Sequence, residues 1–154
     1  MLTSLHPRQL SLLRLRAAIT ALILLAIMFA IDFGPLRQTV VPPGLFSGAA
    51  AALLVGWAMA VPVRRYRSWG YRMEADELHI QRGVWTRFRT IVPFGRVQHI
   101  DVAQGPIERR FGLGTLILHT AGTRSSAVAL PGLAFEEAGR MRDAIRERIR
   151  QDPA

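Results

Sequence analysis

Two long stretches without a charged residue, residues 17–31 and 45–63, lie in the first third of the chain. A helix rises about 1.5 Å per residue, so the second stretch nearly matches a hydrocarbon core of roughly 30 Å. The first is shorter, but leucines before it extend its apolar surface while Arg14 and Arg16 can reach toward the headgroups. Because backbone in lipid must satisfy its own hydrogen bonds, we expect a hairpin of two transmembrane helices, residues 17–33 and 45–63.

The segment between the two apolar stretches, residues 32–44, carries helix-stopping residues at Gly34-Pro35 and at Pro42-Pro43-Gly44. The predicted organisation is therefore an N-terminal segment (1–16), a membrane hairpin (17–63) and one compact soluble domain (64–154).

Arginines flank the apolar stretches on their outer sides and are nearly missing between them, where only Arg37 occurs. Basic residues beside a span resist translocation, so both termini are expected on the cytoplasmic side of a two-pass protein. The predicted topology anchors are Arg14, Arg16, Arg64, Arg65 and Arg67.

A cleaved secretory signal is the alternative for the first stretch, since it combines a basic start with an apolar core. Residues 27–30 make a poor small-residue cleavage site. Even with cleavage, the second stretch would stop transfer and leave the C-terminal part in the cytoplasm.

Small residues recur every four positions on the second apolar stretch, at Gly48, Ala52, Gly56 and Ala60. Such a ridge lets another helix approach closely, and the first apolar helix is the expected partner. The alternative is compositional, because an alanine-rich helix produces this spacing by chance.

The chain has a formal net charge of +9 at neutral pH and contains no cysteine. Such a basic protein could bind nucleic acid, but residues beside an anionic leaflet are also attracted to it, so membrane lipids are the expected contact and nucleic acid is not. The missing cysteines exclude disulfides, thiol nucleophiles and cysteine-type zinc sites.

Beyond Trp69 the hydrophobic period changes from helical to alternating, with turn residues every eight to twelve positions, which predicts a meander of antiparallel strands. Pro106 and the glycines at 112 and 114 predict a short helix within the connector 104–114. The six expected strands are residues 70–73, 78–82, 84–92, 96–102, 115–120 and 125–130.

The last segment carries an apolar stripe at spacings of three and four, which predicts an amphipathic helix with solvated ion pairs on its other side. The expected soluble domain is a small, mainly β barrel (α+β by class) capped by this C-terminal helix. The stripe consists of Phe135, Ala138, Met141, Ile145 and Ile149.

The soluble part contains four short elements: Arg82-Gly83 followed by Arg87, Ile91-x-Pro93, Arg96-x-Gln98 and Phe111-Gly112-Leu113. Together these elements resemble the bacterial pleckstrin-homology-like membrane protein family of YdbS type, and the resemblance extends over nearly the whole chain. The resemblance implies two transmembrane helices and a cytoplasmic PH-like split β-barrel of seven strands with a C-terminal helix, which is one strand more than the pattern predicts. The family has no activity that the resemblance could assign to this chain. The resemblance implies a bacterial inner-membrane location, and members of the family often occur beside a larger relative that holds repeated domains of the same kind.

Pleckstrin-homology domains that bind phosphoinositides generally place basic residues in their first hairpin. Here that hairpin is acidic, with Glu74, Asp76 and Glu77, and would repel an anionic headgroup. The remaining candidates for anion or lipid contact are Arg87, Arg89, Arg109 and Arg110. The alternative is a solvated face, or salt bridges to Asp101 and Glu108.

Three histidines, His79, His99 and His119, fall on different predicted strands, but their spacing does not support a metal site. Asp101 follows His99 on the same strand face, without a nucleophile in a recognisable context. We therefore expect no enzyme, no cofactor and no metal.

The function favoured by these observations is a non-enzymatic inner-membrane protein whose PH-like domain docks other proteins. The expected partner is a related PH-domain membrane protein or a second copy of the chain. Exposed strand edges and the connector 104–114 are the expected contact surfaces. The alternative function is anionic lipid or membrane-surface sensing, and a membrane-bound enzyme ranks below both.

Overall fold

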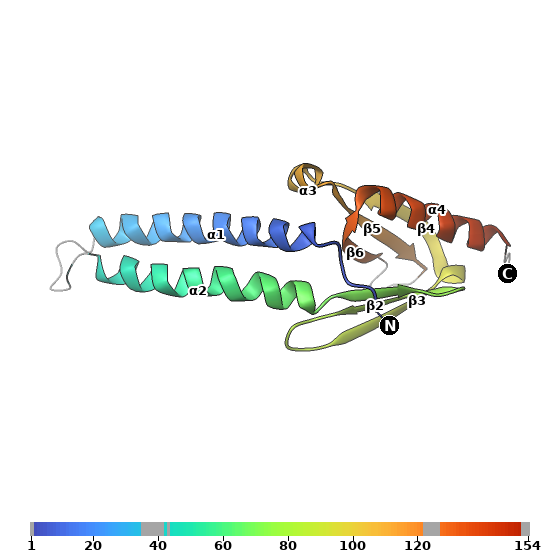
Figure 1. The fold of residues 1–154 in the computed structure, drawn as a ribbon, viewed down its shortest axis with the longest axis horizontal. Coiled ribbons are helices and arrows are strands. Elements are labelled where there is room, and N and C mark those ends of the chain that lie inside the picture. Colours follow the sequence, from blue (N-terminus) through green and yellow to red (C-terminus); the bar gives the residue numbers. More distant parts are fainter. Residues whose placement is uncertain (1, 35–41, 43, 122–126, 152–154) are drawn as a thin grey trace. The chain divides into compact units, whose positions relative to one another are not determined.

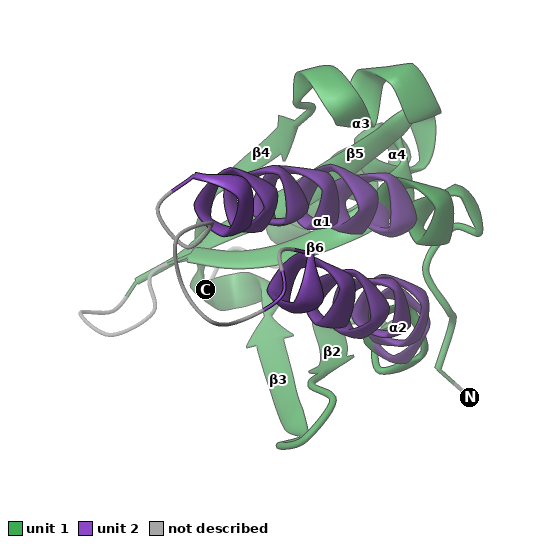
Figure 2. Cartoon of the chain, turned by 90° about the vertical axis from the view of Figure 1, so that its left-hand side faces the viewer, with its two compact units in different colours: residues 1–12, 65–154 green, residues 13–64 purple. Residues whose placement is uncertain are grey.

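A computed structural model describes residues 2–34, 42, 44–121 and 127–151 of the chain. The chain divides into two compact units, which Figure 2 colours separately. One unit contains residues 13–64, and the other combines residues 1–12 with residues 65–154.

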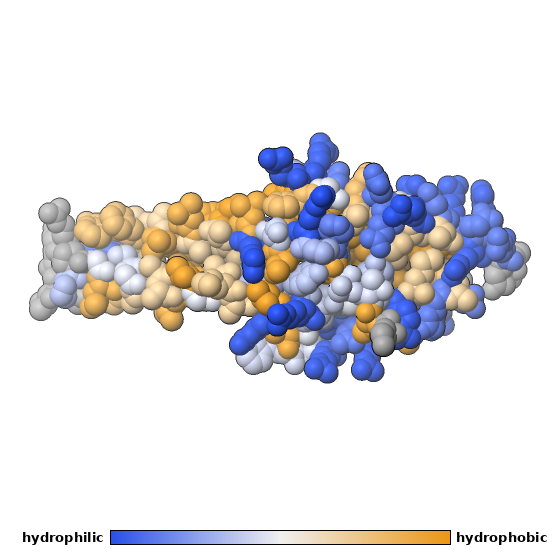
Figure 3. Space-filling view, viewed as in Figure 1, coloured by the Kyte–Doolittle hydropathy of each residue, from blue (hydrophilic) through white to orange (hydrophobic). Residues whose placement is uncertain are grey.

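Two long helices form the first unit and extend beyond the apolar stretches that predicted them. Helix α1 runs over Arg8–Phe33 and helix α2 over Leu45–Arg67. Both are long and apolar enough to cross a membrane, and only 11% of the most apolar window of each is buried. Their surface is largely hydrophobic in Figure 3. A core helix of a soluble protein would instead be mostly buried, so the exposed apolar surface fits contact with lipid.

Asp32 lies in the last turn of α1, within the predicted first span of residues 17–33 and at the start of the predicted connecting segment. Its Oδ2 atom accepts hydrogen bonds from the backbone N–H groups of Gly44 and Ser47, both at 3.0 Å, and from the Ser47 hydroxyl at 2.8 Å. These bonds satisfy N–H groups that the first turn of α2 cannot pair within the helix. The predicted stops at Pro35 and Pro43 lie outside the described residues.

The small-residue ridge lies on an exposed side of α2. An added Cβ at Gly48 or at Gly56 would meet no atom within 4 Å, so α1 does not pack on this ridge as expected. Ala51, Leu54 and Ala58 of α2 instead line the space that α1 borders. The role of this ridge in close helix packing therefore remains a prediction.

The second unit is a PH-like domain of two antiparallel three-stranded sheets and a C-terminal helix (Figure 1). The first sheet has the order β1-β2-β3 and the second β4-β5-β6. The expectation of six strands is confirmed within the described residues. The seventh strand that the resemblance implied is not among them. The strands are β1 (Gly70–Met73), β2 (Glu77–Arg82), β3 (Phe88–Pro93), β4 (Val97–Ala103), β5 (Leu113–Thr120) and β6 (Ala127–Ala134).

Strand β3 starts four residues later than predicted, because the turn before it is wider than a tight hairpin. Gly83 adopts a φ of +113°, and its position opposite Thr86 leaves no room for a Cβ atom. Residues 84–86 bend away before Phe88 pairs with Arg82. Phe88, the first residue of β3, is exposed.

Strand β6 continues through Pro131-Gly132, where a break was expected. Thr115 pairs with Pro131 and Gly114 with Leu133, so Gly132 is left as a bulge with a φ of +76°. The bulge lets the strand bend without ending. The predicted start of this strand at residue 125 and the turn at residue 122 lie outside the described residues.

Helix α4 (Phe135–Gln151) covers the core, and its predicted stripe is buried at Ala138, Met141 and Ile145. Phe135, at the start of the stripe, is exposed. The short helix α3 (Pro106–Phe111) has Pro106 in its first turn and a left-handed Gly112 at its end, as predicted. The core contains Leu5, Tyr71, Leu78, Ile80, Val92, Phe94, Val97, Leu116, Leu118, Leu130, Leu133, Ala138, Met141 and Ile145.

The N-terminal segment is part of this domain, which the sequence pattern does not indicate. Thr3 forms a two-way backbone bridge with Tyr71, at 2.7 and 3.0 Å. The His6 N–H donates to the Gly132 carbonyl at 2.8 Å, and Leu5 is buried in the core. Trp69 also packs against this core.

Candidate functional site

A groove of about 590 Å³ runs between β4 and α4. Strand β4 is the last strand of its sheet, so one of its edges has no strand partner among the described residues. On the β4 side the groove is lined by Val97, Gln98, His99 and Ile100. Gln98 is bulged, since Val97 pairs with Thr120 and His99 already with His119.

The helix side of the groove is basic. Arg142, Arg146 and Arg150 recur every four residues on α4, with Ile149 between the last two. Arg142 binds Asp143 at 2.8 Å. The Arg146 and Arg150 side chains make no ion pair with any described residue, although the sequence predicted solvated pairs on this helix.

His99 and His119 meet across β4 and β5, and both contact Asp101. The His99 Nε2 atom is 2.9 Å from Asp101 Oδ1, and the His119 Nε2 atom is 3.1 Å from Oδ2. His79 belongs to the other sheet, so the three histidines do not converge. His99 and Asp101, which the sequence predicted on the same face of one strand, are thus in contact, and His119 shares the same carboxylate.

The acidic turn between β1 and β2 is held by positive charges. Arg72 binds Glu74 at 3.1 Å, and the His79 Nε2 atom lies 2.5 Å from Glu77 Oε1. The Arg148 guanidinium of α4 donates to the backbone carbonyls of Glu74 and Ala75. Glu74, Glu77 and His79 bring one ligand atom each within 4.8 Å of one another, a set that could hold a cation. Because Arg72 already balances Glu74, we assign the cluster to the ion-paired turn.

Tyr71 connects β1 to α4 inside the domain. Its hydroxyl donates a 2.7 Å hydrogen bond to Glu137 Oε1. Burial, together with the bond to the Glu137 carboxylate and its negative charge, raises the pKa of Tyr71 well above its ordinary value. The hydroxyl therefore stays protonated and acts as a structural donor.

The four candidate arginines for anion contact belong to two separate places. Arg87 and Arg89 lie on the connection into β3 and on β3 itself, and Arg109 and Arg110 lie on α3. Figures 1 and 2 both show α3 on the opposite side of the domain from the turn between β2 and β3. All four are exposed. An anion contact at one pair is therefore separate from a contact at the other.

The sequence analysis missed the most exposed apolar side chain at the site of the first arginine pair. Trp85 is 93% exposed in the turn between β2 and β3, with Val84 and Phe88 also exposed beside it. The available signal was a tryptophan two residues after Gly83 and between Arg82 and Arg87. The arginine spacing of four on α4 was likewise visible.

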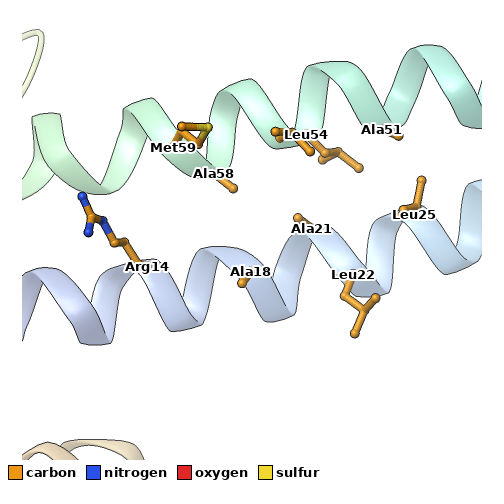
Figure 4. A pocket seen from close by; sticks show the side chains of 10 residues that line it. Arg14, Ala18, Ala21, Leu22, Leu25, Ala51, Leu54, Ala58 and Met59 are labelled. Carbon is orange, nitrogen blue, oxygen red and sulfur yellow. The ribbon is translucent and has the colours of Figure 1, made fainter.

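The five predicted topology anchors are among the described residues: Arg14, Arg16 and Arg64 belong to the hairpin unit, and Arg65 and Arg67 to the other unit. Arg14 borders a second groove of about 640 Å³ between α1 and α2 (Figure 4). The other lining residues are apolar, such as Ala18, Ala21 and Leu54. This groove is open to the surroundings of the hairpin, and it has the lining expected of a surface in contact with lipid tails.

The model of a family described as bacterial PH domain matches residues 10–149. The match therefore covers both helices and nearly the whole soluble domain. No solved structure matches the chain.

Two curated proteins of Bacillus subtilis (strain 168) are similar to the chain. The transmembrane protein YdbS is 41% identical over 85 residues, which make up 55% of this chain and 52% of YdbS. The transmembrane protein YdbT is 31% identical over 102 residues, which make up 65% of this chain and 21% of YdbT. The chain thus spans about half the length of the first relative and a fifth of the second.

Proposed function

Since the chain belongs to the bacterial PH-domain family, we propose that it is a non-enzymatic membrane protein whose PH-like domain docks other proteins. The observation that carries this proposal is the groove between the free edge of β4 and the arginines of α4. The proposed location is the bacterial inner membrane, with two spans and both termini in the cytoplasm.

The open edge of β4 supplies backbone groups for a partner strand. An extended segment can add to such an edge through main-chain hydrogen bonds, while pockets beside it select side chains. Val97, Ile100 and Ile149 give the groove an apolar lining, and Gln98 is exposed next to it. A lipid headgroup could use the arginines but not the strand edge, so a peptide uses more of this surface.

The charges of the groove favour an acidic segment. Arg146 and Arg150 have no ion-pair partner among the described residues, and a carboxylate-bearing strand would supply one to each guanidinium. Charge complementarity of this kind fixes register and speeds association more than it adds affinity.

The proposed partner is a related PH-domain membrane protein, with a second copy of the chain as the alternative. Similarity to both YdbS and YdbT supports this choice, because two distinct members of the family occur in one organism. The connector 104–114 is the second proposed contact surface, since α3 is largely exposed at its ends.

Co-purification from native membranes in mild detergent tests the docking function. Reversing two groove charges, with Arg146→Glu and Arg150→Glu, is expected to weaken capture of the companion protein by roughly tenfold or more. Arg140→Glu is the matched control, because it makes the same charge change on the same helix outside the groove. Equal loss in the control, or a full-length protein that runs as a lone monomer without a companion, would contradict docking.

A photo-crosslinking side chain adds a positional test. Placed at Gln98, which lines the groove, it is expected to capture the companion. Placed at Glu136, which is exposed on α4 away from the groove lining, it is expected to capture much less. The reverse pattern would move the docking surface elsewhere on the domain.

The second candidate function is anionic lipid sensing. It is favoured by the exposure of Arg87 and Arg89 in a part of the chain, residues 78–100, that holds no Asp or Glu. Replacing Arg87 and Arg89 by glutamate in the full-length chain is expected to reduce binding of its PH-like domain to anionic lipid. Capture of the companion protein should be unchanged. Reversal at Arg109 and Arg110 tests the other pair in the same way.

A further inference from the structure

The turn between β2 and β3 exposes a concentrated apolar surface. Among the described large hydrophobic side chains, Trp85 has the highest exposure, 93%, and Phe88 and Val84 are exposed to 54% and 44%. Adjacent exposed side chains of this size mark an interaction surface more often than a solvated turn. Tryptophan in particular is enriched where an apolar environment meets water.

The register of the first sheet fixes which end of the domain carries this turn. Gly70, the first residue of β1, pairs with Gln81 near the end of β2. The turn therefore leaves the sheet at the end where β1 begins, and it continues past Gly70. Helix α2 ends at Arg67, and three residues of chain span at most about 10 Å. The exposed tryptophan thus lies at the end of the domain closest along the chain to the spanning helix.

The charges around the turn match a phosphate-rich surface. Arg82, Arg87 and Arg89 surround Trp85 in sequence, and residues 78–100 contain no carboxylate. The Arg82 guanidinium lies 6.0 Å from the centre of the Phe88 ring. Guanidinium groups bind phosphate through paired hydrogen bonds, and each basic residue near an anionic leaflet adds attraction.

We propose that residues 82–88 enter the interfacial layer of the leaflet that faces the domain, with Trp85 at headgroup depth. Arg82, Arg87 and Arg89 contact lipid phosphates on either side of it. The domain then has a membrane contact in addition to its two chain connections to the hairpin unit, after residue 12 and before residue 65. Only the arginine contacts in this inference rest on the lipid-sensing candidate function. Insertion of the apolar Trp85 side chain does not require anionic lipid.

Depth-dependent fluorescence quenching in nanodiscs tests the insertion. The full-length chain carrying Trp57→Phe and Trp69→Phe leaves Trp85 as the reporter, since the chain has three tryptophans. Phosphatidylcholine brominated close to the headgroup is expected to quench Trp85, while iodide in the water phase quenches it weakly. Strong iodide quenching with no effect of the brominated lipid would overturn the proposal.

A second reporter avoids removing Trp69, which packs on the core. The chain has no cysteine, so Thr86→Cys can carry an environment-sensitive dye without other changes. In nanodiscs containing the full-length chain, the emission of this dye is expected to be shifted to the blue relative to the free dye in water. The same dye at Glu136→Cys, an exposed position on α4, is expected to show no such shift.

The lipid composition separates this inference from the lipid-sensing function. Quenching in phosphatidylcholine alone and in its mixture with phosphatidylglycerol supports insertion and contradicts anionic sensing. Quenching that requires phosphatidylglycerol and disappears in Arg87→Glu with Arg89→Glu supports both. A Trp85 that is protected only after a companion protein is added would make the turn a protein contact and overturn the lipid assignment.

Discussion

The hydroxyl of Tyr66 donates a 2.9 Å hydrogen bond to the backbone carbonyl oxygen of Leu5, which lies 61 positions earlier in the chain. Tyr66 belongs to the last turn of α2, and Leu5 shortly precedes α1. The domain therefore holds the segment that enters the membrane hairpin and the segment that leaves it. Leu5 itself is 2% exposed in the core of that domain.

Leu5→Ala is expected to destabilise the domain by about 2–4 kcal/mol, since it removes a fully buried side chain. For a domain of this size, that corresponds to a fall in Tm of about 10 °C or more. Thermal unfolding of the detergent-solubilised protein, followed by tryptophan fluorescence, measures it. Leu2→Ala is the control, because Leu2 is 43% exposed and a similar loss there would argue against a buried role for Leu5.

Gly83→Ala is expected to distort the turn between β2 and β3. The residue has a φ of +113°, and an added Cβ would lie 1.8 Å from the Thr86 carbonyl oxygen. A cost of about 1–3 kcal/mol follows from strain of this kind. Gly95→Ala, where a Cβ meets no atom within 4 Å, should leave the midpoint of unfolding nearly unchanged. Equal effects of the two substitutions would contradict the turn geometry.

Asp32→Ala is expected to loosen the first turn of α2, because it removes the acceptor of three hydrogen bonds from Gly44 and Ser47. Loss of a helix cap costs about 1 kcal/mol. Hydrogen exchange followed by mass spectrometry should show faster deuterium uptake in residues 44–48. Asp32→Asn keeps an oxygen acceptor and is expected to have a smaller effect, whereas unchanged uptake in both variants would rule out the cap.

Tyr71 predicts a stability loss at alkaline pH. Its pKa is raised above the ordinary value of 10.0 by burial and by the Glu137 carboxylate, so the folded domain opposes ionisation. The contribution is complete below pH 10.0 and is lost as the pH rises through the higher pKa of the folded state. Tyr71→Phe should flatten the decline of Tm above that pH. A decline of equal slope in both proteins would assign it to other groups.

The arginine distribution predicts the orientation of the chain in the membrane. Single cysteines can be introduced freely, since the chain has none. A membrane-impermeant maleimide should label Gln38→Cys, between the two apolar stretches, in intact cells. It should label Glu136→Cys only after the membrane is opened. Labelling of Glu136→Cys in intact cells would reverse the predicted topology.

Much of the fold follows from local sequence signals. The two apolar stretches predict α1 and α2, and alternation predicts six strands because one face of each strand meets the core. Pro106 and Gly112 delimit α3 correctly, since both act through their own backbone conformations. The spacing on α4 predicts its buried face at Ala138, Met141 and Ile145.

The structural features that the sequence did not predict depend on contacts between residues far apart in the chain. Docking of Leu5 depends on Tyr71 and on the bulge at Gly132, and neither is near it in sequence. The β4–α4 groove joins Gln98 to Arg146 across two separate elements. Exposure of Trp85 depends on the width of one turn, which the φ of Gly83 sets.

The bridge between Thr3 and Tyr71 also orders the biogenesis of the chain. Residues 2–6 are synthesised before both helices, yet their partners at Tyr71 and Gly132 are synthesised only after them. Domains fold during synthesis once their parts have emerged, so this domain cannot complete its fold until Tyr71 and Gly132 have been synthesised. Closure of the domain around residues 2–6 is thus a late step, which occurs when the hairpin is already available for insertion.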